Sequence, residues 1–234
     1  MVDGNRMASR CSCIHLDRRV ALFNRACIPV RFANKWIEYY EEGHRSQRQI
    51  KYSLLAHKES YEPGQKGFLL WGEPGIGKTH LLCGLIGYLT LERGIPCRFI
   101  EFMRLIMDLK AAYAEGRWDS EVITPLLNVD VLVIDELGKG RNSDFELDIL
   151  DQLISSRYNT HRTLHCTSNY PPQPRQQKTT AAGSVAMALR EEQVLAERVG
   201  ERIFSRLHDM CQFVHIQGKD YRKEQLKPRK TGRS

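Results

Sequence analysis

The chain has 234 residues, a hydrophobic fraction of 41% and a formal net charge of +7 at neutral pH. This length accommodates one large domain with small appendages, and the apolar residues suffice for a core. No run of about 18 apolar residues occurs, so we expect no membrane span. Seven cysteines, an odd number, disfavour a disulfide framework and favour a reducing cytoplasm.

The positive charge is concentrated at the two ends of the chain. Residues 219–234 carry seven Lys and Arg against two acids, and residues 1–19 carry four Arg against two acids. Residues 20–218 are therefore neutral in sum. Such basic ends suit contact with a polyanion, although a solvated tail without a partner is an equal alternative.

Four potential zinc ligands lie in a short N-terminal segment, residues 1–30. These are Cys11, Cys13, His15 and Cys27. They could bind Zn²⁺ as a set, but the paired C-x-x-C spacing is absent, and free thiols are the simpler interpretation. Residues 31–66 follow as a polar, partly helical adaptor or linker that ends in a Pro-Gly turn.

A glycine-rich stretch follows a short apolar run at residues 67–71, which suits a buried strand. The stretch Gly72-Glu73-Pro74-Gly75-Ile76-Gly77-Lys78-Thr79 has the pattern G-x-x-x-x-G-K-T, and a helix is expected over residues 80–92. This strand–loop–helix context is what a phosphate-binding loop requires, and an ordinary glycine-rich turn is the alternative. Lys78 would reach the outer phosphates of a nucleotide, and the Thr79 hydroxyl would hold Mg²⁺. We expect ATP to contact these eight residues and His80.

Strand and helix patterns alternate over the rest of the chain. Strands are expected at residues 97–102, 129–134, 163–167 and 212–217, and helices at 103–115, 119–127, 145–158 and 185–207. A polar loop is expected from residue 171 to about 183. This alternation predicts an α/β domain, residues 67–217, with a mainly parallel central sheet flanked by helices. A basic tail, residues 218–234, follows it.

Two carboxylates end the apolar run at residues 129–134. Asp135 and Glu136 would lie at the carboxyl end of the sheet, where open α/β sheets bind ligands. Asp135 would help to hold Mg²⁺, and Glu136 would polarise the attacking water. Either acid alone would be an ordinary strand end.

Polar residues also end the strand at 163–167, which we expect next to the phosphate-loop strand. Asn169 in Thr167-Ser168-Asn169 could orient the water near the γ-phosphate, and a surface turn is the alternative.

Three arginines recur at helical spacing in the last expected helix. Arg198, Arg202 and Arg206 lie at i, i+4 and i+8, apart from an apolar stripe. The simplest interpretation of such a row is a solvated helix face.

These motifs together resemble a known family. The ordered set formed by the phosphate loop, Val131-Leu132-Val133-Ile134-Asp135-Glu136, Thr-Ser-Asn-Tyr and Glu-Arg-Ile-Phe-Ser-Arg-Leu is similar to AAA+ P-loop ATPases of the DnaC-type helicase loaders and the IstB-type transposition helpers. The resemblance covers roughly residues 28–222. It implies that Arg206 is an arginine finger and Arg222 a weaker second sensor. It also implies that residues 102–118 lie where related initiators line single-stranded DNA, and no full helical lid is expected.

The resemblance implies a Mg²⁺-dependent ATPase. Its most natural task is to load a replicative helicase onto single-stranded DNA as a homo-oligomer assembled with ATP or DNA. An ATP-dependent helper of a transposase shares every motif and remains an alternative. A nucleotide-gated binding module without turnover is a second alternative, disfavoured by the intact Asp135-Glu136 pair.

Overall fold

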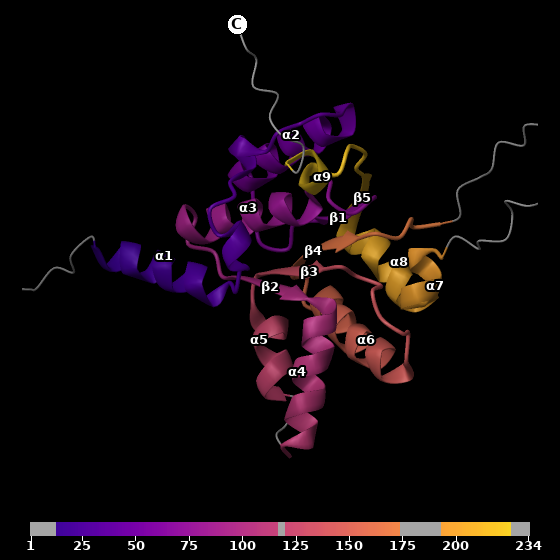
Figure 1. Ribbon diagram of the computed structural model, residues 1–234. Helices are drawn as coiled ribbons and strands as arrows, with labels where there is room; N and C mark the ends of the chain where they lie inside the picture. Colours follow the sequence, from indigo (N-terminus) through magenta and orange to yellow (C-terminus); the bar gives the residue numbers. More distant parts are fainter. Residues whose placement is uncertain (1–12, 117–119, 174–192, 226–234) are drawn as a thin grey trace, which may run out of the picture.

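The computed structural model describes residues 13–116, 120–173 and 193–225, and it contains a five-stranded sheet with helices on both faces (Figure 1). The elements are α1 Cys13–Arg25, the 3-10 helices η1 Val30–Phe32 and η2 Ile37–Tyr39, α2 Arg45–Glu59, β1 Gly67–Trp71, α3 Lys78–Leu91, β2 Cys97–Glu101, α4 Phe102–Ala114, α5 Ser120–Asn128, β3 Val131–Asp135, α6 Asp144–Asn159, β4 Thr163–Ser168, α7 Leu195–Val199, α8 Glu201–Met210, β5 Cys211–His215 and α9 Tyr221–Gln225.

The sheet has the strand order β2-β3-β4-β1-β5, and every neighbouring pair is parallel. Trp71 at the end of β1 lies opposite Ser168 of β4, and Glu101 at the end of β2 lies opposite Asp135 of β3. The carboxyl ends of the strands therefore meet at one edge, as the predicted parallel sheet requires. Ligands of open α/β sheets bind at this edge.

Two hydrophobic cores lie on opposite faces of the sheet. The chain around α1, α2 and α3 covers one face, and α4 to α8 cover the other (Figure 1). Alternate residues of β3 enter the two cores, Val131 and Val133 on the α3 side and Leu132 and Ile134 on the α6 side. Because β3 is covered on both faces, all five of its residues are buried.

The predicted adaptor packs against the α3 side of the sheet. Ile37, Tyr40, Ile50 and Leu54 are buried in the same core as α3. Lys51 Nζ on α2 donates to Tyr40 O at 2.8 Å, which ties α2 to the chain preceding it. This packing brings residues 40–47 beside the glycine-rich loop.

β3 begins two residues later than the sequence pattern predicts, and Arg157 of α6 supplies the reason. Arg157 is fully buried, and its guanidinium donates to four carbonyl oxygens. They belong to Leu126 (2.8 Å), Val129 (2.9 Å), Asp130 (3.1 Å) and Thr163 (2.6 Å). The carbonyls of residues 129 and 130 therefore bind a side chain, and the ladder with β2 starts at Val131.

Residues 193–207 are mostly helical as predicted, but the continuous helix expected around residues 197–207 is interrupted. Gly200 adopts a φ of +80° and separates α7 from α8, so the three arginines do not form one row. A left-handed φ is readily adopted only by glycine. The apolar stripe is confirmed: Leu195, Val199, Ile203 and Leu207 are all buried.

Several expectations fall outside the described residues. They concern Cys11 and the side chain of Cys13, the end of the segment 102–118 expected near DNA, most of the polar loop at 171–183, residues 185–192 of the expected helix, and residues 226–234 of the basic tail. Among the helices of the described residues, none combines the length and apolar character needed to span a bilayer.

Candidate functional site

The predicted phosphate loop lies between β1 and α3, at the carboxyl edge of the sheet. Gly75 and Gly77 have φ values of +84° and +94°, which side chains with a Cβ rarely adopt. A Cβ on Gly77 would lie 2.4 Å from the Tyr40 ring, and one on Gly75 would lie 1.9 Å from Asp220 Oδ1. The two glycines thus allow the loop to turn and let other segments approach it closely.

Lys78 begins α3, and its ammonium spans the loop. Its Nζ donates to Gly72 O at 2.8 Å, to Glu73 O at 2.9 Å and to Asn169 Oδ1 at 2.9 Å. Lys78 is only 7% exposed, and burial lowers its pKa to about 8, although nearby carboxylates, Asp135 first, oppose the shift. The structure therefore brings Lys78 and Asn169 into direct contact, although the sequence analysis related them only through the expected nucleotide.

Thr79, Asp135 and Thr167 form a hydrogen-bonded group beside the loop. Thr79 Oγ1 donates to Asp135 Oδ1 at 2.9 Å, and Thr167 Oγ1 donates to the same oxygen at 2.6 Å. Burial raises the pKa of Asp135, and the two hydroxyl donors partly offset this shift. A carboxylate next to a hydroxyl matches the oxygen ligands that Mg²⁺ prefers, so these residues fit the ion.

Glu136 directly follows β3 and has a left-handed φ of +57°, which few residues other than glycine adopt. Its backbone N–H donates to Thr167 Oγ1 at 3.0 Å, and its carboxylate accepts a hydrogen bond from Lys139 Nζ. Glu101 at the end of β2 is close enough that Glu136 contributes, after burial, to a raised pKa of Glu101. The expected base therefore lies in a local group of two carboxylates and one ammonium.

Arg206 does not extend into solvent as the sequence predicted. Its Nη1 donates to Asp151 Oδ1 at 2.9 Å and to Ser155 Oγ, both on α6, and its side chain is 21% exposed. Arg198 donates to the carbonyl oxygens of Gly138 and Gly140. Arg202 is the exposed member of the three, with its Nε 3.7 Å from Asp151 Oδ1.

The segment after β5 packs on the phosphate loop. Ile216 N donates to Trp71 O at 2.8 Å, and Tyr221 N donates to Gly75 O at 3.0 Å. Arg222 on α9 pairs with Asp220 at 3.2 Å, and its charge contributes to the lowered pKa of Lys78. A shallow pocket of about 400 Å³ opens here between the loop and this segment, lined by Glu73, Pro74, Gly218, Asp220 and Lys223.

His80 turns away from the loop interior. Its ring packs edge-on against Tyr40, with a centroid distance of 5.4 Å, and a ring nitrogen lies 3.3 Å from Trp36 O. Burial lowers the pKa of His80, so the ring is neutral at neutral pH. Its side chain thus contacts the adaptor, and only its backbone remains for a contact with phosphate.

The sequence analysis missed four side chains at this site: Tyr40, Gln47, Glu101 and Lys139. Glu101 could have been found from the register of two parallel strands, and Lys139 from its spacing of three residues from Glu136. Tyr40 and Gln47 contact Ile76 across 36 and 29 residues of sequence, and no local pattern predicts such contacts.

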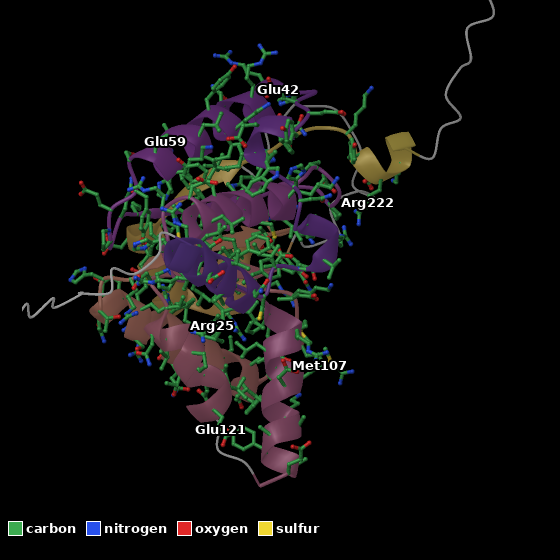
Figure 2. The ribbon with its side chains drawn as sticks, turned by 90° about the vertical axis from the view of Figure 1, so that its left-hand side faces the viewer. Arg25, Glu42, Glu59, Met107, Glu121 and Arg222 are labelled. Carbon is green, nitrogen blue, oxygen red and sulfur yellow. The ribbon has the colours of Figure 1, made fainter. Side chains whose placement is uncertain are left out.

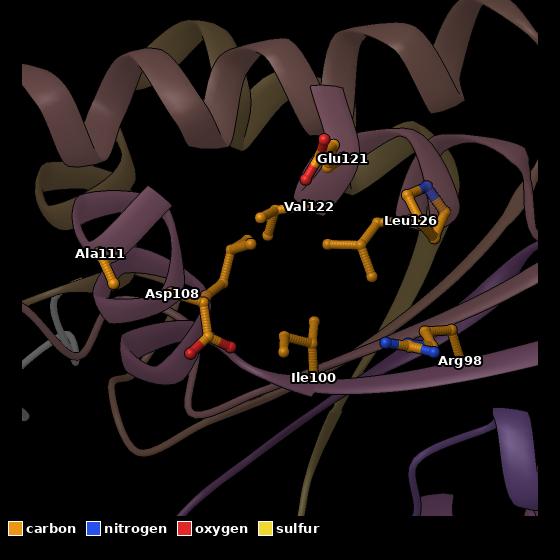
Figure 3. Close-up of a pocket in the computed structure, with 9 residues that line it drawn as sticks. Arg98, Ile100, Asp108, Ala111, Glu121, Val122 and Leu126 are labelled. Atoms are coloured by element: carbon orange, nitrogen blue, oxygen red, sulfur yellow. The ribbon is translucent and has the colours of Figure 1, made fainter. Parts of the chain in front are cut away.

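A second cavity, of about 330 Å³, lies between β2, α4 and α5 (Figure 3). Arg98, Asp108 and Glu121 bring charges to its walls, while Ile100, Val122 and Leu126 are apolar. None of the phosphate-loop residues lines it. In Figure 2, Met107 and Glu121 lie on the α4–α5 pair, well below Arg222 on α9.

Residues 13–116, 120–173 and 193–225 contain no group of three or more His, Cys, Asp or Glu side chains suited to a metal ion.

Known proteins resemble this chain in sequence and fold. The chain is 28% identical over 148 residues to the replicative helicase loader DnaC of Escherichia coli strain K12. The aligned region covers 63% of this chain and 60% of that protein. A crystal structure of the DnaC helicase loader superposes with a TM-score of 0.67 and 28% identity, covering 80% of this chain and 99% of that one. The replication initiator DnaA bound to AMPPCP and single-stranded DNA gives a TM-score of 0.62 at 18% identity, covering 86% of this chain and 56% of that one.

These likenesses have different weight. At 18% identity the DnaA structure supports the fold alone, and the fold is that of the AAA+ P-loop ATPases. The chain matches only about three fifths of the length of the curated DnaC proteins. The family model described as IstB-like ATP binding protein matches residues 15–228. This match extends over most of the chain, from α1 to beyond α9, and the chain therefore belongs to the family of IstB-like ATP-binding proteins.

Proposed function

We propose that this protein binds Mg·ATP, hydrolyses it, and uses the nucleotide state to load a replicative helicase onto single-stranded DNA. The observation that carries the proposal is the convergence of Lys78, Asn169, Thr79, Asp135 and Glu136 at one edge of the sheet. They come from the ends of β3 and β4 and the start of α3. Phosphoryl transfer requires this combination of cation, metal ligands and water-orienting groups.

Each residue has a role in the proposed reaction. Lys78 exchanges its carbonyl partners in the loop for the outer phosphate oxygens, and Asn169, already bonded to Lys78, orients the γ-phosphate and the water. Glu136 accepts a proton as water attacks the γ-phosphorus, and the bond to the bridging oxygen breaks to give ADP and phosphate. Mg²⁺, when bound through Thr79 and Asp135, neutralises charge on the β- and γ-phosphates.

The proposed partners are a replicative helicase and single-stranded DNA. The relatives named DnaC are replicative helicase loaders, and they support this assignment for a chain that matches part of their length. For DNA, the proposed surface is α4, with Arg104 and Lys110, together with the basic residues 219–234. Free thiols are found at Cys27, Cys83, Cys97, Cys166 and Cys211, which suits the reducing cytoplasm proposed as the compartment.

The proposed active species is a homo-oligomer in which Arg206 of one subunit completes the nucleotide site of its neighbour. An arginine supplied in this way stabilises the charge that develops on the γ-phosphate. Within one chain Arg206 is bound to Asp151 on α6, so assembly has to replace this ion pair.

A transposase helper is the second candidate, because the matching family is described as IstB-like. One experiment separates the candidates. The tagged protein is used in a pull-down from a lysate of its host, with ATP, with ADP or without nucleotide, and the retained proteins are identified. We expect a replicative helicase to be retained with ATP. Retention of a transposase instead would support the second candidate, and retention of neither with any nucleotide would contradict both.

Phosphate release tests the reaction itself. A nucleotide-gated binding module without turnover, the third possibility, should bind ATP and produce no phosphate at any protein concentration.

The DNA contact of the tail is tested by a deletion. Deletion of residues 223–234 removes five Lys and Arg. Each lost phosphate contact should reduce the salt slope of single-strand binding by about 0.7. An unchanged slope would show that the tail does not contact DNA.

A further inference from the structure

The adaptor contacts the phosphate loop at one carbonyl group, that of Ile76. Tyr40 Oη donates to Ile76 O at 2.6 Å, and Gln47 Nε2 donates to the same oxygen at 3.3 Å. Tyr40 is 5% exposed and Gln47 is also buried, so both donors reach the loop from within the fold. Two side-chain donors fill both lone pairs of this one loop carbonyl.

The geometry of the peptide bond gives this contact a consequence. Ile76 C=O and Gly77 N–H belong to one trans peptide, and its two polar groups point in opposite directions. Because the carbonyl points at Tyr40, the Gly77 N–H points to the other side of the loop, which the Lys78 ammonium spans. The N–H groups of such loops bind the phosphates of a nucleotide.

We infer that Tyr40 and Gln47 are positioning residues that aim the Gly77 N–H at the β-phosphate of a nucleotide. The inference rests on the proposed nucleotide site and assigns two residues of the adaptor to it. The segment after β5 makes a similar contact with another carbonyl of the loop. Tyr221 N donates to Gly75 O, which directs the Ile76 N–H of the same peptide away from α9.

The surroundings of Tyr40 keep its hydroxyl in place as a donor. The ring packs directly over Gly77, where only the absence of a Cβ leaves room for it, and it meets the His80 ring edge-on. Burial raises the pKa of Tyr40 to about 12, so the phenol stays protonated wherever the protein is folded. Gln47 is itself fixed, because its Oε1 accepts from Gly43 N at 2.8 Å.

The test compares the affinities for ADP and AMP in variants that lack one of the two side-chain donors. Tyr40→Phe keeps the ring and removes the donor, and we expect the affinity for ADP to fall about three- to tenfold, the usual effect of one hydrogen bond. The affinity for AMP, which lacks the β-phosphate, should change by less than twofold. Gln47→Leu should lower ADP affinity in the same direction, and the double variant should lower it further. The Gly77 amide resonance should move in each variant before nucleotide is added.

Tyr61→Phe is the matched control. Tyr61 is equally buried, and its hydroxyl donates to Thr163 Oγ1 far from the loop. It should change thermal stability about as much as Tyr40→Phe does, while ADP affinity and the Gly77 resonance stay at their wild-type values.

The outcomes separate this inference from the proposed function. ADP affinity equal to wild type in Tyr40→Phe, or an equal loss for ADP and AMP, would overturn the positioning role. If the wild-type chain does not bind ADP, or if Lys78→Ala binds it as tightly, the nucleotide site itself is overturned.

Discussion

Arg206 and Asp151 form an ion pair between α8 and α6, with Nη1 2.9 Å from Oδ1. The residue proposed to act on a neighbouring subunit is therefore held in its own subunit first. Because Ser155 also bonds both side chains, this arrangement fixes the guanidinium in one place. Assembly and catalysis then depend on the same side chain, and two predictions follow from that dependence.

Mixing two inactive variants should restore ATPase activity. Arg206→Ala should bind ATP but hydrolyse it poorly, because a finger supplied by a neighbour is worth about 10³ to 10⁵ in rate. Lys78→Ala should fail at its own loop yet still supply Arg206 to the next subunit. Phosphate release from the mixture should exceed that of either variant and rise with protein concentration. A mixture that stays inactive although both variants co-assemble with wild type would show that Arg206 does not act on a neighbour.

Releasing Arg206 from its own chain should favour assembly. Asp151→Asn removes the charge that holds the guanidinium, so we expect the protein concentration for half-maximal ATPase activity to fall about three- to tenfold, the effect of about 1 kcal/mol. Asp148→Asn, an exposed residue of the same helix, is the matched control for charge. If both variants behave as wild type, the ion pair does not compete with assembly.

Glu136→Gln should separate binding from hydrolysis. The amide keeps the shape of the side chain but cannot accept the proton, so turnover should slow by about two to four orders of magnitude while ATP affinity is retained. Glu92→Gln, an exposed change of the same kind on the end of α3, should leave turnover unaltered. Single-turnover phosphate release checks both, and turnover of Glu136→Gln within twofold of wild type would exclude Glu136 as the base.

Nucleotide binding should take up a proton at alkaline pH. Burial lowers the pKa of Lys78 in the free protein to about 8, and bound phosphates favour its charged form and raise that pKa again. Above pH 8 the free lysine is largely neutral, so binding must protonate it, and ATP affinity should fall by up to about tenfold per pH unit. Calorimetry at pH 9 in buffers of different ionisation enthalpy should show uptake of close to one proton, and at pH 7 almost none. Equal uptake at both pH values would contradict the role of Lys78.

Arg157 should be essential for stability rather than for catalysis. Burial lowers its pKa to about 10, which still leaves it charged at neutral pH. Arg157→Met would leave carbonyls without their donor in the core, and we expect the free energy of unfolding to fall by about 2 to 4 kcal/mol. Arg202→Met, on an exposed side chain, should change it by less than about 0.5 kcal/mol. Urea denaturation measures both, and similar midpoints for the two variants would contradict the prediction.

Local patterns were sufficient for the sheet and for the residues that follow its strands. The apolar runs before Lys78 and Asp135 predicted β1 and β3, and the strand expected at residues 163–167 pairs with β1 as predicted. Such runs are informative because a strand covered on both faces has no polar alternation.

The remaining errors arise where distant residues decide local structure. The start of β3 depends on Arg157, and the end of α7 depends on the left-handed Gly200, which helical spacing alone does not reveal. Arg206 has helical spacing typical of a solvated face, but its partner Asp151 lies 55 residues earlier. Tyr40 and Gln47 sit in a polar stretch without a motif, and only the folded chain brings them to Ile76.

Some of the residues that support the phosphate loop are synthesised much later than the loop itself. Ile216 N donates to Trp71 O at 2.8 Å, directly before the loop, and Tyr221 N donates to Gly75 O within it at 3.0 Å. A ribosome releases the chain from its N-terminus, so the whole G-x-x-x-x-G-K-T motif leaves the exit tunnel long before residues 216–221 do. The nascent protein therefore carries the complete motif while one side of its loop is still unsupported. We therefore expect the proposed nucleotide to bind only late in synthesis, after β5 and the segment that follows it have docked.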